Sequence, residues 1–186
     1  QVFGREAENV VRLTRSYRSS WEIAEFAHGI LPEADCGKNV RRSGRKPRVV
    51  RVAARDQLME LASWEMATLK QDGMASIALV CKTAEEAFGV YSKLMHEHDV
   101  RLVEDSSIAF HHGLVVLPVY LAKGLEFDAV IIPDAGEAVY RSESERKVLY
   151  TACTRALHSL VICYSGEPSP LLPMHNEELY DSEAVT

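Results

Sequence analysis

The chain has 186 residues, 47% of them hydrophobic, so it can bury a core and falls within the usual size of one domain. It has no run of 18 or more apolar residues and no secretory signal pattern at its start, so we expect a soluble, cytoplasmic protein without membrane contact. The formal net charge of −6 argues against nonspecific coating of nucleic acid.

The predicted elements begin with a short strand at 9–14 and a helix at 19–31. In that helix, Ser19 and Glu22 have the spacing of a capping box. A strand at 47–53 follows. The next helix, strand and helix are predicted at 55–71, 76–81 and about 83–97, and Gly73 ends the first of these helices. Further strands are predicted at 113–119, 128–134 and 159–164, with a helix over about 144–157 between the last two.

Several of these strands are near-continuous runs of Val, Ile and Leu, and helices separate them. This pattern is typical of a parallel sheet covered on both faces, so we predict a doubly wound α/β domain over residues 1–166. Residues 167–186 contain three prolines and many acids, and we expect a loop or a partly ordered tail there. Because the first residue is Gln1, we expect the chain to be a piece of a longer protein.

The basic residues are concentrated near the start of the chain. Residues 1–55 hold 12 Lys and Arg against 6 Asp and Glu, whereas residues 56–186 hold 9 against 21. The basic stretch at 37–51 contains Gly, Ser and Pro, as expected of a loop that leads into a strand. This loop is either solvated or in contact with phosphate groups.

The cysteines and histidines give no metal signature. The four cysteines lack CxxC spacing and mostly lie in apolar stretches, so we expect reduced thiols in the core rather than metal or redox use. The histidines have no third ligand type clustered with them, and we predict no metal site. The residues concerned are Cys36, Cys81, Cys153 and Cys163, and His96, His98, His111 and His112.

Proteins with parallel sheets bind their ligands at the carboxyl ends of the strands, so three stretches beside strands are candidate ligand sites. In the first, at 13–20, Arg18 lies between a strand and a helix start, which suits a phosphate, and Tyr17 has a ring that can stack on a base. The alternatives are a structural ion pair for Arg18 and a core position for Tyr17.

The second stretch is 120–134. Lys123 and Gly124 form a tight turn that a ligand can approach closely, and Glu126 can accept hydrogen bonds from sugar hydroxyls. An ordinary solvated turn explains the same residues.

The third stretch is 150–165. Here Arg155 emerges between the apolar and polar sides of the predicted helix, one turn before the next strand. Its guanidinium either pairs with a carboxylate or reaches a ligand phosphate.

Together the three stretches resemble motifs of superfamily 1 helicases of the UvrD/Rep type. YRSSWEIAEFA (17–27) is similar to motif IV, LAKGLEFDAVII (121–132) to motif V and ERKVLYTACTRA (145–156) to motif VI. The resemblance covers roughly residues 9–165. It implies a RecA-like fold of the P-loop NTPase type, and more specifically the second RecA-like domain of an ATP-dependent DNA helicase or translocase.

The resemblance also implies roles for the site residues. Arg18 and Arg155 correspond to arginines that reach the γ-phosphate, Tyr17 to a residue that stacks on adenine, and Gly124 and Glu126 to the nucleotide side of motif V. Such arginines supply positive charge to the transferred phosphoryl group.

The chain lacks the phosphate-cradling GxxxxGK[ST] pattern and a strand-terminal Asp-Glu pair for Mg²⁺. ATP and Mg²⁺ are therefore expected on an N-terminal RecA-like domain, and this chain alone is expected to be inactive.

The 113–125 region departs from the family pattern. Motif V of UvrD-type proteins begins with Thr-x-His, which contacts the DNA backbone, whereas Pro118 and Tyr120 stand at these positions here. Tyr120 either stacks on a base of single-stranded DNA or fills core, and Lys123 is a second candidate for nucleic-acid contact. The departure and the short span before motif V favour the HelD branch, with RNA polymerase as a possible partner, over another compact relative. A noncatalytic RecA-like module that docks on a polymerase remains the alternative.

Overall fold

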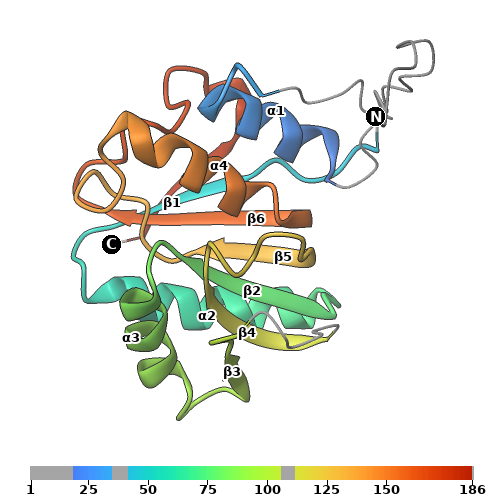
Figure 1. The fold of residues 1–186 in the computed structure, drawn as a ribbon, viewed down its shortest axis with the longest axis vertical. Coiled ribbons are helices and arrows are strands. Elements are labelled where there is room, and N and C mark those ends of the chain that lie inside the picture. Colours follow the sequence, from blue (N-terminus) through green and yellow to red (C-terminus); the bar gives the residue numbers. More distant parts are fainter. Residues whose placement is uncertain (1–18, 35–41, 106–111, 186) are drawn as a thin grey trace, which may run out of the picture.

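The computed structural model describes residues 19–34, 42–105 and 112–185. They form one seven-stranded sheet in the order β3-β4-β2-β5-β6-β1-β7, and every neighbouring pair is parallel (Figure 1). The strands are β1 (Arg48–Val52), β2 (Ser76–Cys81), β3 (Val100–Leu102), β4 (Gly113–Pro118), β5 (Phe127–Ile132), β6 (Ala156–Ser165) and β7 (Asp181–Val185).

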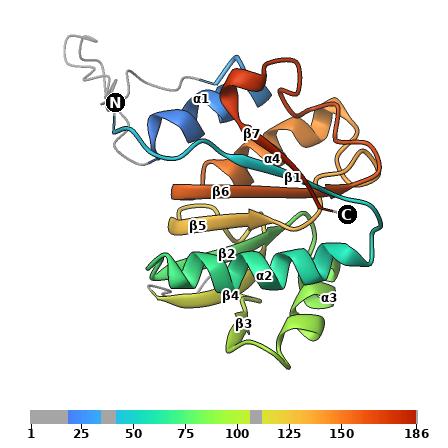
Figure 2. The ribbon, with the colours of Figure 1, turned by 180° about the vertical axis from the view of Figure 1, so that it is seen from behind.

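Two layers of helix cover the sheet. The helices are α1 (Trp21–Ile30), α2 (Gln57–Gln71), α3 (Ala84–Leu94) and α4 (Arg146–Cys153), with short 3-10 turns at Glu143–Glu145 and Glu177–Leu179. The apolar sides of α1 and α4 pack on one face of the sheet, and those of α2 and α3 pack on the other. Figure 1 is seen from the side of α4 and Figure 2 from the side of α2.

The alternation of strand side chains explains why both faces are apolar. Val49 joins the core under α1 and α4, while its neighbour Val50 joins the core under α2 and α3. The same alternation separates Ile77 from Ala78 in β2, a strand whose six residues are all buried. The predicted parallel α/β sheet with helices on both faces is therefore confirmed.

One helix and two strands, β3 and β7, differ from the prediction. The helix expected over 144–157 ends at Cys153, because β6 already begins at Ala156 beside β5. Arg155 thus lies in the turn after the helix and not on the helix. Strand β3 was missed, since its three residues are too few for a clear pattern.

The tail was expected to be loop from residue 167, but residues Asp181–Val185 form the edge strand β7. All five of its residues are exposed, so no apolar alternation marks it as a strand. It forms because its backbone pairs with β1 and because Glu183 binds Arg48 at 2.7 Å.

The predicted capping box of α1 is wrong. Ser20 precedes the helix and makes no side-chain cap. The Glu22 carboxylate instead accepts hydrogen bonds from Ser43 Oγ at 3.0 Å and from the Gly44 N–H at 2.7 Å. Glu22 binds the donors of residues 43–44 and does not cap the start of α1. Its carboxylate therefore attaches the 43–44 loop to α1.

The expected core thiols are confirmed where they are described. Cys81, Cys153 and Cys163 are buried and free, and burial raises the pKa of each thiol. Cys36 and the strand predicted at 9–14 lie outside the described residues. Within the described ranges, no helix has the length and apolar character needed to cross a membrane.

Candidate functional site

Of the predicted site residues that the structure describes, Arg155, Gly124 and Glu126 lie at the amino ends of the central strands, on the right in Figure 1, whereas Tyr120 lies at the carboxyl edge. Arg155 directly precedes β6, while Gly124 and Glu126 directly precede β5. This corrects the expectation of a site at the carboxyl ends. The sequence correctly placed motifs V and VI beside strands, but the expected edge was wrong. The loop before β5 returns to the amino edge of the sheet, and α4 ends at that edge just before β6.

That loop, residues 119–126, connects the carboxyl end of β4 to the amino end of β5 without a helix. Within the loop, Ala122 is fully buried, and Leu121 and Leu125 pack against the same core as α1 and α4. Gly124 adopts a φ of +86°, which turns the chain toward β5 and which residues with a Cβ rarely adopt. The packed loop therefore holds the turn at a defined place.

At this edge, backbone hydrogen bonds connect the predicted motif V to motif VI, and motif IV to Leu157, the residue directly after motif VI. The Phe127 N–H donates to the Arg155 carbonyl at 3.0 Å, and the Ser20 N–H donates to the Leu157 carbonyl at 3.0 Å. Ser20 belongs to the predicted motif IV, Phe127 to motif V and Arg155 to motif VI. Tyr17 and Arg18, predicted at the start of motif IV, lie outside the described residues.

Three oxygen atoms accept hydrogen bonds from the guanidinium of the half-buried Arg155. Nη1 donates to the Leu125 carbonyl at 3.3 Å, Nε to the Thr151 carbonyl at 3.1 Å and Nη2 to Thr154 Oγ1 at 3.2 Å. These carbonyl and hydroxyl acceptors fix the direction of the guanidinium. A guanidinium held in one direction is suited to bidentate binding of a phosphate. The neighbours of Leu125 in the loop, Lys123, Gly124 and Glu126, have exposed side chains or backbone.

At the carboxyl edge, Tyr120 is 61% exposed, so the alternative of a core tyrosine is wrong. It shares a groove of about 190 Å³ with Phe88 of α3, which is 60% exposed. Sequence reasoning missed Phe88, although an apolar residue on the outer side of an amphipathic helix is a usable signal.

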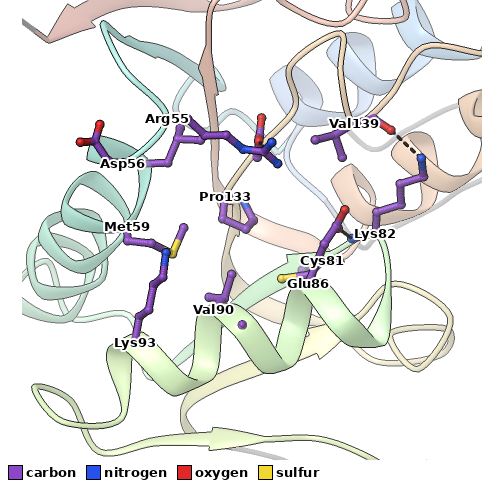
Figure 3. Close-up of a pocket in the computed structure, with 14 residues that line it drawn as sticks. Arg55, Asp56, Met59, Cys81, Lys82, Glu86, Val90, Lys93, Pro133 and Val139 are labelled. Atoms are coloured by element: carbon purple, nitrogen blue, oxygen red, sulfur yellow. Dashed lines mark hydrogen bonds and ion pairs between the residues drawn. The ribbon is translucent and has the colours of Figure 1, made fainter.

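A larger pocket of about 410 Å³ lies at the carboxyl ends of β1, β2 and β5, between α2 and α3 (Figure 3). Its rim carries Arg55, which is 3.4 Å from Asp134, and Lys93. Lys82 follows β2 directly and reaches from the pocket to the Val139 carbonyl at 2.5 Å and to the Glu145 carboxylate. The hydrogen bond from Lys82 lowers the pKa of Glu145 to about 2.

No group of three or more His, Cys, Asp and Glu side chains that could hold a metal ion occurs among the described residues. Of the histidines noted in the sequence, His98 Nε2 lies 2.6 Å from Ser63 Oγ, and His111 is outside the described residues.

Comparisons with known proteins identify similar domains. The family model described as UvrD-like helicase C-terminal domain matches residues 113–163. The C-terminal domain of a possible DNA helicase from Lactobacillus plantarum WCFS1 is 33% identical, with a TM-score of 0.77 over 90% of this chain and 98% of that one. A search of curated proteins found no match.

Two further solved structures are more distant. The Escherichia coli DEAD-box protein SrmB, bound to regulator of ribonuclease activity A, has a TM-score of 0.46 at 11% identity, over 78% of this chain and 92% of that one. The Arterivirus nonstructural protein 10 helicase, in complex with DNA, has a TM-score of 0.46 at 13% identity, over 74% of this chain and 35% of that one. Neither likeness supports an inference.

Proposed function

Since this chain belongs to the family of UvrD-like helicase C-terminal domains and has their RecA-like fold, we propose that it is the second motor domain of an ATP-dependent DNA helicase or translocase. ATP and Mg²⁺ are held mainly by an N-terminal RecA-like domain of the same protein. This domain contributes Arg155 and Arg18 to the phosphates, Tyr17 to the adenine, and Gly124 and Glu126 to the nucleotide side of the cleft.

The observation that carries the proposal is the setting of Arg155. Its backbone carbonyl binds the start of β5, and its guanidinium is aimed by the Leu125, Thr151 and Thr154 oxygen atoms. A cation that is already oriented needs little rearrangement when charge develops on the transferred phosphoryl group. Because the arginine and the nucleotide lie on different domains, hydrolysis requires the domains to close.

The nucleic-acid partner is single-stranded DNA. Exposed Tyr120 stacks on a base, and exposed Lys123 contacts a phosphate. Pro118 and Tyr120 replace the Thr-x-His pattern of the UvrD type, which supports a place in the HelD branch and RNA polymerase as a further partner.

The test is ATP hydrolysis by the full-length protein. Arg155→Ala should lower kcat by about 10³-fold or more, the usual effect of removing an arginine finger, while ATP still binds. Arg155→Lys should recover little, because a lysine cannot reproduce the fork of donors. The matched control is Arg101→Ala, which removes an exposed arginine of β3.

A kcat for Arg155→Ala within twofold of the wild type would contradict the motor assignment. A noncatalytic docking module would give that result and would keep its cellular function in the variant. The isolated chain should hydrolyse no ATP, and turnover by the purified chain that Arg155→Ala abolishes would also count against the proposal.

A further inference from the structure

Lys82 connects two parts of the fold that are distant in sequence. It follows the carboxyl end of β2, where its backbone N–H donates to Glu86 Oε2 at 3.0 Å. Its Nζ donates to the Val139 carbonyl at 2.5 Å and to Glu145 Oε1, and it lies 5.5 Å from the centroid of the Tyr140 ring. Figure 3 shows the side chain reaching Val139 from the α3 side of the pocket.

Glu145 is the residue immediately before α4. Its second carboxylate oxygen accepts hydrogen bonds from the Arg141 N–H at 2.7 Å and the Ser142 N–H at 2.8 Å. The side chains of Lys82 and Glu145 are only 24% and 22% exposed, so water screens their attraction less than on an open surface. The pair therefore attaches the start of α4 to the carboxyl end of β2.

Helix α4 links this attachment to the amino edge of the sheet. Its eight residues span about 12 Å, and Leu149, Ala152 and Cys153 are buried on its inner side. Arg155 follows the last turn and donates from Nε to the Thr151 carbonyl in that turn. A shift at the start of a short, packed helix is carried to its end, because close-packed protein cores deform little.

We propose that Lys82 is a positioning residue for Arg155, acting through its ion pair with Glu145 and through helix α4. The inference rests on the proposed function, in which Arg155 acts on the phosphates of ATP. Arg146 holds the same end of α4 to α1 through the Ile30 carbonyl at 2.6 Å. Lys82 thus sets the position of α4 relative to β2, and Arg146 sets it relative to α1.

The first test uses this chain by itself, since a similar C-terminal domain was solved alone. In Lys82→Met, the Nε–H resonance of Arg155 should shift in a ¹⁵N–¹H NMR spectrum, and in Lys82→Arg it should stay near its wild-type position. The control is Lys93→Met, because Lys93 lines the same pocket and makes no hydrogen bond or ion pair with the described residues. An unchanged resonance in Lys82→Met would overturn the proposal.

The second test uses the full-length protein. Lys82→Met should lower kcat for ATP hydrolysis about tenfold with KM for ATP within twofold, since misplacing a catalytic group affects the reacting state more than binding. Lys82→Arg should recover most of the rate. An unchanged kcat, or a change confined to KM, would reject the role of Lys82.

The two proposals fail in different ways. If Arg155→Ala keeps full activity, the motor function is wrong, and the resonance of Arg155 still decides whether Lys82 positions it. Should Lys82→Met fail to fold, Glu145→Gln provides the second variant. It removes the charge of the pair but keeps an acceptor for the 141–142 amides, and the same shift and the same loss of kcat are expected.

Discussion

The guanidinium of Arg48 binds the carboxylate of Glu65 at 2.7 Å, and Glu65 has none of its surface exposed. Arg48 also donates to both carboxylate oxygens of Glu183 at 2.7–2.8 Å, so one arginine joins β1, α2 and the edge strand β7. The second oxygen of Glu65 has no partner among the described residues. Burial raises the pKa of Glu65, although Arg48 opposes that shift.

Removing Arg48 alone should be costly. Arg48→Met leaves a buried carboxylate without its cation, which typically costs about 3–5 kcal/mol in the free energy of unfolding. The double variant Arg48→Met/Glu65→Met should recover most of this loss, because an apolar pair of similar volume needs no counter-charge. Urea unfolding of the isolated chain measures both.

The control for this experiment is Arg45→Met. Arg45 pairs with Asp72 at 2.6 Å, but its side chain is 68% exposed. Its loss should cost at most about 1 kcal/mol, because exposed ion pairs contribute little. Equal losses in Arg45→Met and Arg48→Met would refute the buried-pair explanation.

Two glycines should respond to alanine in opposite directions. Gly124 and Gly89 both leave open space for a Cβ, so a clash decides neither case. Gly124 has a φ of +86°, and Gly124→Ala should lower the free energy of unfolding by about 1 kcal/mol. Gly89 lies within α3, and Gly89→Ala should raise it by about 0.5–1 kcal/mol. Thermal and urea unfolding check the signs, and a gain in both variants would mean that the turn before β5 tolerates other conformations.

Acid should weaken the fold partly through Glu145. Its pKa is lowered to about 2 from the usual value of 4.5, mainly by the hydrogen bond from Lys82. A carboxyl whose pKa is lower in the folded state stabilises the fold fully above about pH 4.5 and loses that contribution as the pH falls toward about 2. The difference in free energy of unfolding between wild type and Glu145→Gln should therefore shrink from about pH 6 to about pH 3.

For this pH series the control is Glu85→Gln, at an exposed glutamate in the first turn of α3. The difference in free energy of unfolding between wild type and Glu85→Gln should change less between about pH 6 and about pH 3. A constant difference for Glu145→Gln across the series would show that the Lys82 pair does not stabilise the fold.

The aromatic groove predicts how single-stranded DNA is bound. In the full-length protein, Tyr120→Ala should weaken binding to an oligo(dT) strand by about 1–3 kcal/mol, because one stacked base is lost. Tyr120→Phe keeps the ring and should bind nearly as well. Phe88→Ala should resemble Tyr120→Ala, since both rings line one groove.

Salt dependence separates stacking from charge. Loss of the Tyr120 ring should leave the slope of log affinity against log salt unchanged, whereas Lys123→Ala should reduce it by about one. If Tyr120→Ala binds oligo(dT) as well as wild type, the groove does not serve DNA.

The sequence by itself determined the fold class and the family of this protein. Runs such as SIALVC (76–81) are buried on both faces, so only a sheet covered by helices accommodates them. The order of the three motifs pointed to the helicase family, which the comparisons confirm. These features are local or linear, so they can be read along the chain.

Only the tertiary structure decided which edge of the sheet carries Arg155 and which side chains surround it. The loop before β5 crosses the sheet without a helix, and Arg155 follows α4 because pairing of β5 with β6 begins at Ala156. The exposed strand β7 and the Lys82–Glu145 pair likewise depend on partners that are 63 to 135 positions away in the chain. Contacts at such separations leave no periodic pattern in either segment. The two residues become neighbours only when the chain has folded, so neither local sequence reveals its partner.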